Sequence, residues 1–174
     1  SAPGRITQVR RAARAAFATG LRKLDGHVPV PGAYTLTVRL TDDALFQCPF
    51  VMMTEVGAAY LDEAEAAALR TYVDKGGFLW ADDFWGEYAF QVWAEQLAKA
   101  LPPAQYPITD LPPEHPLFRA QFIMAGVPQI ASIGHWFNSG GGTSERGQDS
   151  EVPHARAITD ALGRIMVLMP HNTD

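Results

Sequence analysis

The stretch GGFLWADDFWGE, residues 76–87, decides the fold. Its two glycines follow an amphipathic segment and predict the end of a helix, because glycine readily takes the left-handed backbone of a helix C-terminus. The next four residues, Phe78 to Ala81, are all apolar, which is typical of a strand covered on both faces. Asp82 and Asp83 come directly after this strand, and a new helix is predicted from Gly86. This order of helix, buried strand, polar loop and helix indicates an α/β unit.

The segments on either side repeat the pattern. Before the stretch, Asp62 with Glu65 three residues later predicts a capped helix that carries one apolar stripe as far as Val73. After it, apolar residues at helical spacing continue from Gly86 to Leu101, where two prolines stop the helix. Further strands are predicted at residues 34–40, 49–53 and 164–169, and a further helix at residues 6–24. Residues 106–128 and 138–150 are predicted to be irregular.

Helices that alternate with wholly apolar strands predict a three-layer α/β fold, with a mostly parallel, doubly wound sheet and helices on both faces. At 174 residues the chain fits one domain, residues 1–174. A doubly wound domain rarely begins with a helix, so we expect its first strand to lie outside this chain.

Composition excludes several classes of function. The net charge is −5, so no overall field attracts nucleic acid. The early arginines and lysines alternate with apolar residues and are interpreted as the solvated face of the first helix. No apolar run approaches the roughly 20 residues that cross a bilayer.

Cys48 is the single cysteine, so there is neither a disulfide nor a cysteine metal knuckle, and its place before a strand favours a small buried residue. The chain opens without methionine, which indicates a processed start and is compatible with an extracytoplasmic location.

Polar residues follow three of the predicted strands. In parallel sheets, ligands bind beyond the carboxyl ends of the strands, so these residues are expected to share one edge of the sheet. Asp82, Asp83 and His171 are the candidate catalytic residues. The candidate ligand-binding residues are Glu55, Trp85, Glu87, His115, Asn172 and Asp174.

The Asp82-Asp83 pair has two interpretations. Two neighbouring carboxylates at a strand end could act as a general acid and base, or hold a divalent metal. Alternatively, one aspartate caps the helix that begins near Gly86 while the other faces solvent. His171 is either a base or a surface histidine near a strand end. No cofactor is predicted, and the expected partner is a small polar ligand or another protein.

Several motifs together resemble one uncharacterised bacterial family, the domain of unknown function 4159. They cover most of the chain from Leu40 onward. The motifs are Leu40-Thr41-Asp42, residues 76–87, Leu111-Pro112-Pro113-Glu114-His115-Pro116-Leu117-Phe118, residues 141–147 and His171-Asn172-Thr173-Asp174.

The resemblance implies a flavodoxin-like fold, similar to class I glutamine amidotransferases. Those enzymes carry a cysteine at the turn after the central strand, where this chain has Ala81-Asp82-Asp83-Phe84. The amidotransferase mechanism therefore does not carry over. The family pattern also continues past the equivalent of Asp174, so we expect part of the domain to be missing here.

Three functions follow as hypotheses. The first is a non-catalytic binding or scaffold domain that uses the common edge of the sheet. The second is a hydrolase that uses Asp82 or Asp83 with His171, with or without a divalent metal, and stacks Trp85 or Trp136 on a sugar ring. The third is an assembly role in a larger complex, since the domain resembles modules attached to membrane-anchored chains.

Overall fold

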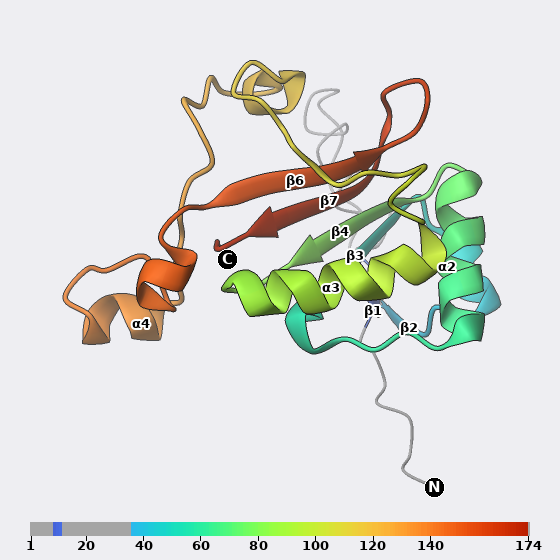
Figure 1. Cartoon of the computed structure of the whole chain (residues 1–174), viewed down its shortest axis with the longest axis horizontal. Coiled ribbons are helices and arrows are strands. Elements are labelled where there is room, and N and C mark those ends of the chain that lie inside the picture. Colours follow the sequence, from blue (N-terminus) through green and yellow to red (C-terminus); the bar gives the residue numbers. More distant parts are fainter. Residues whose placement is uncertain (1–8, 12–35, 174) are drawn as a thin grey trace, which may run out of the picture.

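A computed structural model describes residues 9–11 and 36–173 (Figure 1). Its centre is a seven-stranded sheet with the order β2-β1-β3-β4-β7-β6-β5. The strands are β1 (Val9–Arg11), β2 (Leu36–Val38), β3 (Phe50–Thr54), β4 (Phe78–Asp82), β5 (Thr109–Asp110), β6 (His154–Thr159) and β7 (Ile165–His171).

The middle of the sheet is parallel and its flanks are antiparallel. β3 pairs in parallel with β4, with Thr54 opposite Asp82, and β4 pairs in parallel with β7. β1 runs antiparallel to both β2 and β3, and β6 runs antiparallel to both β5 and β7. The α/β class is thus confirmed, but the prediction of a mostly parallel sheet is wrong, because the sheet is mixed.

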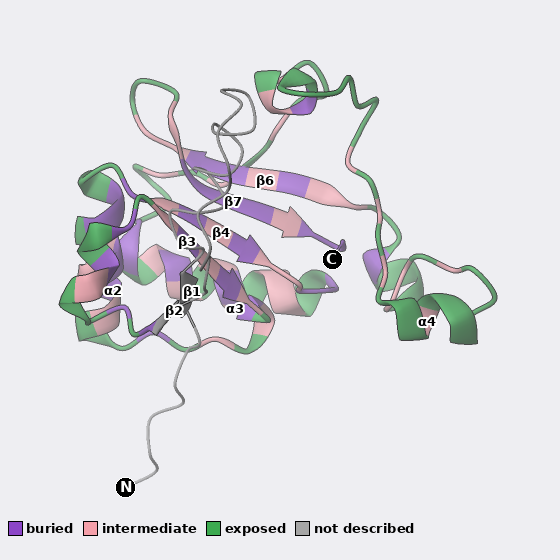
Figure 2. Ribbon diagram, turned by 180° about the vertical axis from the view of Figure 1, so that it is seen from behind, coloured by how far each residue is buried: buried purple, intermediate pink, exposed green. Residues whose placement is uncertain are grey.

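Two long helices cover one face of the sheet. They are α2 (Glu63–Asp74) and α3 (Glu87–Ala100), which lie side by side in Figures 1 and 2. α2 begins with the predicted capping box, in which Asp62 accepts from the Glu65 backbone N–H at 2.8 Å. Leu69 of α2 and Trp93 of α3 share one buried cluster with Leu79 of β4. The core therefore lies between this helix layer and the sheet.

The described residues differ from two expectations about the layers. The helix predicted over residues 6–24 is contradicted at Val9–Arg11, which form β1, and the rest of that segment lies outside the described residues. The predicted helices on both faces are also not found: in the described part of the chain, both long helices pack on the face that carries Val51, Leu79 and Val167. The described residues therefore form two layers, the sheet and one layer of helices, and the expected three-layer arrangement is not confirmed.

A separate unit extends from the end of the sheet. We call residues 128–150 the projection; it contains α4 (Ile133–Asn138) and the 3₁₀ turn η4 (Gly147–Ser150). In Figure 1 it lies beyond the arrowheads of β4 and β7. Before the projection, the chain passes along the outer side of β6 and forms the 3₁₀ turn η3 (Pro116–Arg119). Two further 3₁₀ turns, η1 (Asp43–Gln47) and η2 (Val56–Ala58), come directly before and after β3. No helix among the described residues is long and apolar enough to span a bilayer.

Candidate functional site

The carboxyl ends of β3, β4 and β7 lie together at one edge of the sheet, which we call the rim. The first residue after each of these strands has a left-handed backbone: Glu55 with φ 56°, Asp83 with φ 54° and Asn172 with φ 61°. The Glu55 N–H donates to the Asp82 carbonyl at 3.0 Å, and the Asn172 N–H donates to the Phe84 carbonyl at 3.2 Å. Since β3, β4 and β7 are parallel, the common edge expected from the sequence is present.

The rim carries carboxylates in two environments. Glu55 and Glu87 are exposed, whereas Asp82 and Asp83 are half-buried. Burial raises the pKa of Asp82, the backbone hydrogen bond with Asp83 works against this rise, and the negative charge of Asp83 adds to it. Asp82 and Asp83, at the end of β4, are therefore less exposed than ordinary surface aspartates.

Neither aspartate caps the next helix. The residue before α3 is Gly86, which has φ 87° and contributes no side-chain cap. The Asp149 carboxylate from η4 instead accepts from the Glu87 N–H at 3.3 Å. A side chain on Gly86 would collide with this carboxylate, so glycine allows the close approach of η4. The interpretation of Asp82 or Asp83 as a helix cap is therefore wrong.

His171 is buried instead of open to the rim. Its Nδ1 lies 2.9 Å from an Nη of Arg156, and its Nε2 lies 3.0 Å from the Gly86 carbonyl oxygen. Because arginine can only donate, Nδ1 must accept, and Nε2 therefore carries the proton and donates to Gly86. The ring also stacks on Phe84, with 4.9 Å between centroids. The pKa of His171 is lowered to about 4, mainly by burial and also by the nearby Arg156 charge, while the hydrogen bond to the Gly86 carbonyl opposes the fall. His171 is thus a neutral ring with both nitrogens occupied.

Asn172 and Thr173 join the rim to the projection. The Asn172 side chain accepts from the Gly86 N–H at 2.8 Å and donates to the Val152 carbonyl at 2.8 Å. The Thr173 hydroxyl accepts from the Ile130 N–H and donates to the Pro128 carbonyl. The polar groups of both side chains are therefore used within the fold. Asp174 lies outside the described residues.

A family model, the Domain of unknown function (DUF4159), matches residues 8–174, nearly the whole chain. The chain belongs to the DUF4159 family. No curated protein matches it.

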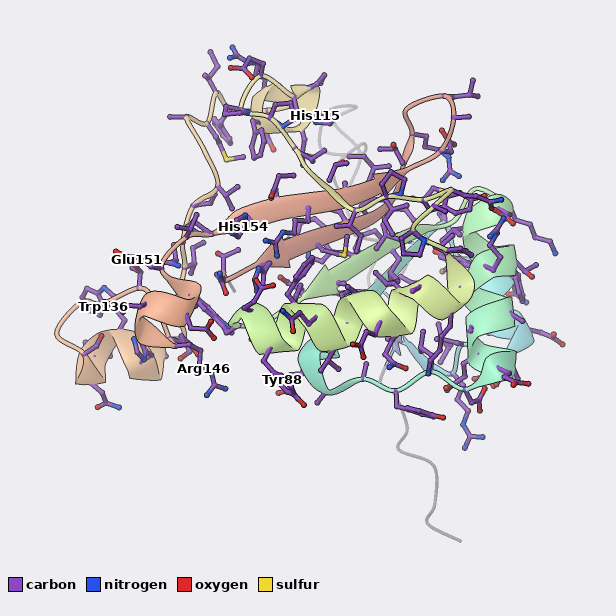
Figure 3. All side chains as sticks on the ribbon, viewed as in Figure 1. Tyr88, His115, Trp136, Arg146, Glu151 and His154 are labelled. Atoms are coloured by element: carbon purple, nitrogen blue, oxygen red, sulfur yellow. The ribbon has the colours of Figure 1, made fainter. Side chains whose placement is uncertain are left out.

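Two other residues predicted for the site of this DUF4159 chain are not open to a ligand at the rim: His115 lies elsewhere, and Trp85 is buried. His115 begins η3, where its Nδ1 accepts from the Leu117 N–H at 3.1 Å, and Figure 3 places it on the far side of β6 from the start of α3. Trp85 is only 9% exposed, so its faces are not open to a sugar ring, and its indole N–H has no acceptor among the described residues. Neither residue forms a binding surface together with the rim carboxylates.

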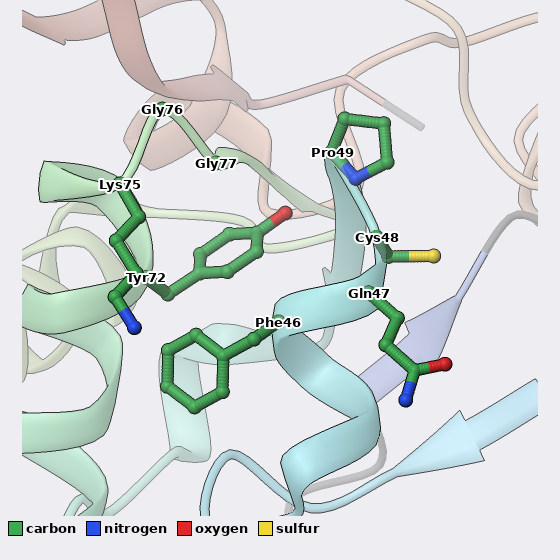
Figure 4. Close-up of a pocket in the computed structure, with 8 residues that line it drawn as sticks. All are labelled: Phe46, Gln47, Cys48, Pro49, Tyr72, Lys75, Gly76 and Gly77. Atoms are coloured by element: carbon green, nitrogen blue, oxygen red, sulfur yellow. The ribbon is translucent and has the colours of Figure 1, made fainter.

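The described residues contain no cluster of three or more His, Cys, Asp or Glu side chains placed to hold a metal ion. A small hollow does adjoin Cys48, but it lies at the amino ends of β3 and β4, where Pro49, Tyr72 and Gly77 also line it (Figure 4). It is therefore at the opposite end of these strands from the rim. Cys48 itself is buried, as its sequence context predicted.

Sequence reasoning missed two residues that organise the rim of this DUF4159 domain. Nothing in the sequence indicates that Asp149 reaches the start of α3, where its carboxylate accepts from the Glu87 N–H. Gln129 was not singled out, yet its Nε2 donates to the carbonyls of Ser150 and Asn172 at 2.7 and 3.0 Å, and its Oε1 accepts from Thr143 at 2.9 Å. Such contacts join segments far apart in the chain and leave no local pattern.

Proposed function

We propose that this chain is a non-catalytic binding or scaffold domain, whose rim holds a small polar ligand or a segment of a partner protein. The observation that carries the proposal is the left-handed backbone at Glu55, Asp83 and Asn172, the first residue after each of three parallel strands. For residues other than glycine this conformation costs roughly 1–2 kcal/mol each, somewhat less for asparagine. Such strain is concentrated at functional sites more often than elsewhere.

The chemistry of the rim indicates what it would hold. Glu55 and Glu87 are exposed, and Asp82 and Asp83 are partly accessible beside them. Ionised carboxylates only accept hydrogen bonds, so the matching ligand presents N–H or O–H donors, or carries a positive charge. A lysine- or arginine-containing segment and a small amine both meet this requirement.

The state of His171 supports a binding role over catalysis. A general base needs a free nitrogen within reach of its substrate. Both ring nitrogens of His171 are hydrogen-bonded inside the protein, and the side chain is buried. We further propose that the parallel strands with α2 and α3 form a flavodoxin-like core of the kind found in class I glutamine amidotransferases, with β1 and β6 as antiparallel additions.

Nuclear magnetic resonance titration tests the binding proposal. The ¹⁵N-labelled protein is titrated with ethanolamine, arginine, glucose and MgCl₂ as separate probes. We expect ethanolamine or arginine to shift the amides of residues 54–56, 82–87 and 172–173. The E55Q/D83N double variant should lose these shifts, whereas Glu95→Gln, an exposed site farther along α3, should keep them. Shifts that are absent, or that survive in the double variant, would overturn the proposal.

A hydrolase is the second candidate, because Asp83 has the left-handed backbone of a strand-to-helix elbow and sits beside the half-buried Asp82. This function predicts turnover of p-nitrophenyl acetate or p-nitrophenyl glycosides that Asp83→Asn abolishes and Glu95→Gln leaves intact. If the wild-type protein shows no turnover above buffer with or without MgCl₂, this candidate fails and the binding proposal is unaffected.

A further inference from the structure

The projection exposes an apolar surface that the described residues do not cover. Within α4, Ile133, Trp136 and Phe137 are 71%, 46% and 68% exposed, and α4 has no buried residue. Their spacing of three and four residues places them on one side of the helix. Ile130, just before α4, is also more than half exposed. We call these four side chains the apolar tip.

The tip is large enough to be functional. Side chains of this size carry on the order of 200 Å² each, so four of them at about 60% exposure present roughly 500 Å² of apolar surface. The largest patch on a typical monomer is about 300–600 Å² and is often an interaction site. The tip is also held in place: Thr143 and the carbonyls of Ser150 and Asn172 bind Gln129 at its base, and Ser132 N–H donates to Glu145 at 2.7 Å.

The charges around the tip favour a second copy of this chain as the partner. The chain has 14 Lys and Arg and 19 Asp and Glu, yet residues 128–144 contain none of them. In a twofold dimer each group faces the same surface of the other copy, so a charged surface would repel itself. The chain as a whole is acidic, so two copies repel one another. The tip itself is neutral and extends away from the sheet in Figures 1 and 2.

We propose that two copies of this chain associate through the apolar tip, with α4 of one copy antiparallel to α4 of the other. An antiparallel arrangement brings Ile133 of each helix opposite Phe137 of its partner and places Trp136 near the twofold axis. The dimer would bury roughly 1,000 Å² in total, at the low end of specific interfaces, so association is expected at micromolar concentrations. This inference does not depend on the rim binding a ligand.

Sedimentation velocity between 1 and 200 μM tests the proposal. The wild-type protein should change from monomer to dimer over this range. Ile133→Glu and Phe137→Glu should each raise the dimer dissociation constant about tenfold or more, because each buries an unpaired carboxylate against an apolar side chain of the other copy. Leu162→Glu is the matched control, since Leu162 is 95% exposed in the turn between β6 and β7, and it should leave the dimer unchanged. Circular dichroism should be the same for all four proteins.

Cross-linking gives a second measurement that does not depend on a destabilising substitution. In a Cys48→Ser background, a short bismaleimide should cross-link the Asn138→Cys protein to a second copy of itself. It should not cross-link the Leu162→Cys protein. A wild-type protein that stays monomeric at 200 μM overturns the proposal, and binding of that monomer to phosphatidylcholine vesicles would assign the tip to a lipid surface instead. A dimer that neither Ile133→Glu nor Phe137→Glu weakens would also overturn it, because the dimer would then form elsewhere.

Discussion

At the scale of single residues, the rim depends on backbone conformations that L-amino acids avoid. Asp83 has φ 54° and Glu55 has φ 56°, although neither residue is a glycine. Gly76, which ends α2 with φ 93°, shows the ordinary solution for such a position. The rim therefore keeps carboxylates where stability alone would favour glycine.

We predict that Asp83→Gly stabilises the protein by about 0.5–1 kcal/mol, because relief of the left-handed strain exceeds the added flexibility of the unfolded chain. Asp83→Ala should give no gain, since alanine keeps the strain. Gly76→Ala is the control: no atom lies within 4 Å of the added Cβ, so its expected cost of about 1 kcal/mol comes from the backbone alone. Urea unfolding followed by tryptophan fluorescence measures all three, and a less stable Asp83→Gly protein would contradict the prediction.

The buried imidazole of His171 predicts a pH-dependent stability. Its pKa falls from 6.5 to about 4 on folding, so the unfolded chain takes up a proton below pH 6.5 while the folded protein does not. The full contribution is present above pH 6.5 and is lost as the pH falls toward 4, by about 3 kcal/mol. His171→Gln should flatten this part of the profile, measured by urea unfolding at pH 7 and 4.5. His115→Gln should not, and equal pH profiles for wild type and His171→Gln would refute the assignment.

At the scale of elements, the tail of β7 and the base of the projection form one hydrogen-bonded unit. Gln129 lies at its centre, between the carbonyls of Ser150 and Asn172 and the hydroxyl of Thr143. These bonds hold the projection to the sheet because α4 itself has no buried residue. The orientation of α4 therefore depends on a few polar contacts instead of apolar packing.

Gln129→Ala should release the projection without unfolding the sheet. We expect hydrogen exchange of amides in residues 129–150 to accelerate by about tenfold or more, since a hydrogen bond contributes roughly 1 kcal/mol and the three bonds of Gln129 to Ser150, Asn172 and Thr143 are lost. Amides of β3 and β4 should exchange as in the wild type. Gln121→Ala, at an exposed position between η3 and the projection, is the control. Acceleration throughout the chain would show that Gln129 supports the whole fold instead.

Local patterns explain which elements the sequence predicts correctly. α2, β4 and α3 follow one another with clear caps, apolar runs and stop signals, and each lies within a few residues of its expected place. β6 (His154–Thr159) was missed because polar residues interrupt its apolar ones, so no local pattern marks the strand that pairs with β7. The contacts of Asp149 and Gln129 with the rim were missed for the same reason, whereas the strand ends of the rim followed from the apolar runs alone.

At the scale of the whole molecule, stability is centred on the parallel strands and the two helices above them. Leu79 of β4 is fully buried in the cluster shared by α2 and α3. Leu79→Ala should cost about 3–5 kcal/mol, because it removes apolar contacts and leaves a cavity. Leu162→Ala, the same change at a 95% exposed position, should stay within about 0.5 kcal/mol. Thermal unfolding compares the two, and a small loss for Leu79→Ala would place the core elsewhere.

The position of β7 in the sheet also has a consequence for synthesis of the protein on the ribosome. β7 is the last described strand in sequence, yet it lies in the interior of the sheet, between β4 and β6. The β3–β4 half and the antiparallel pair of β5 and β6 therefore cannot join until β7 has left the exit tunnel. Nascent chains of this domain should accordingly stay accessible to proteases and chaperones until β7 has emerged from the ribosome.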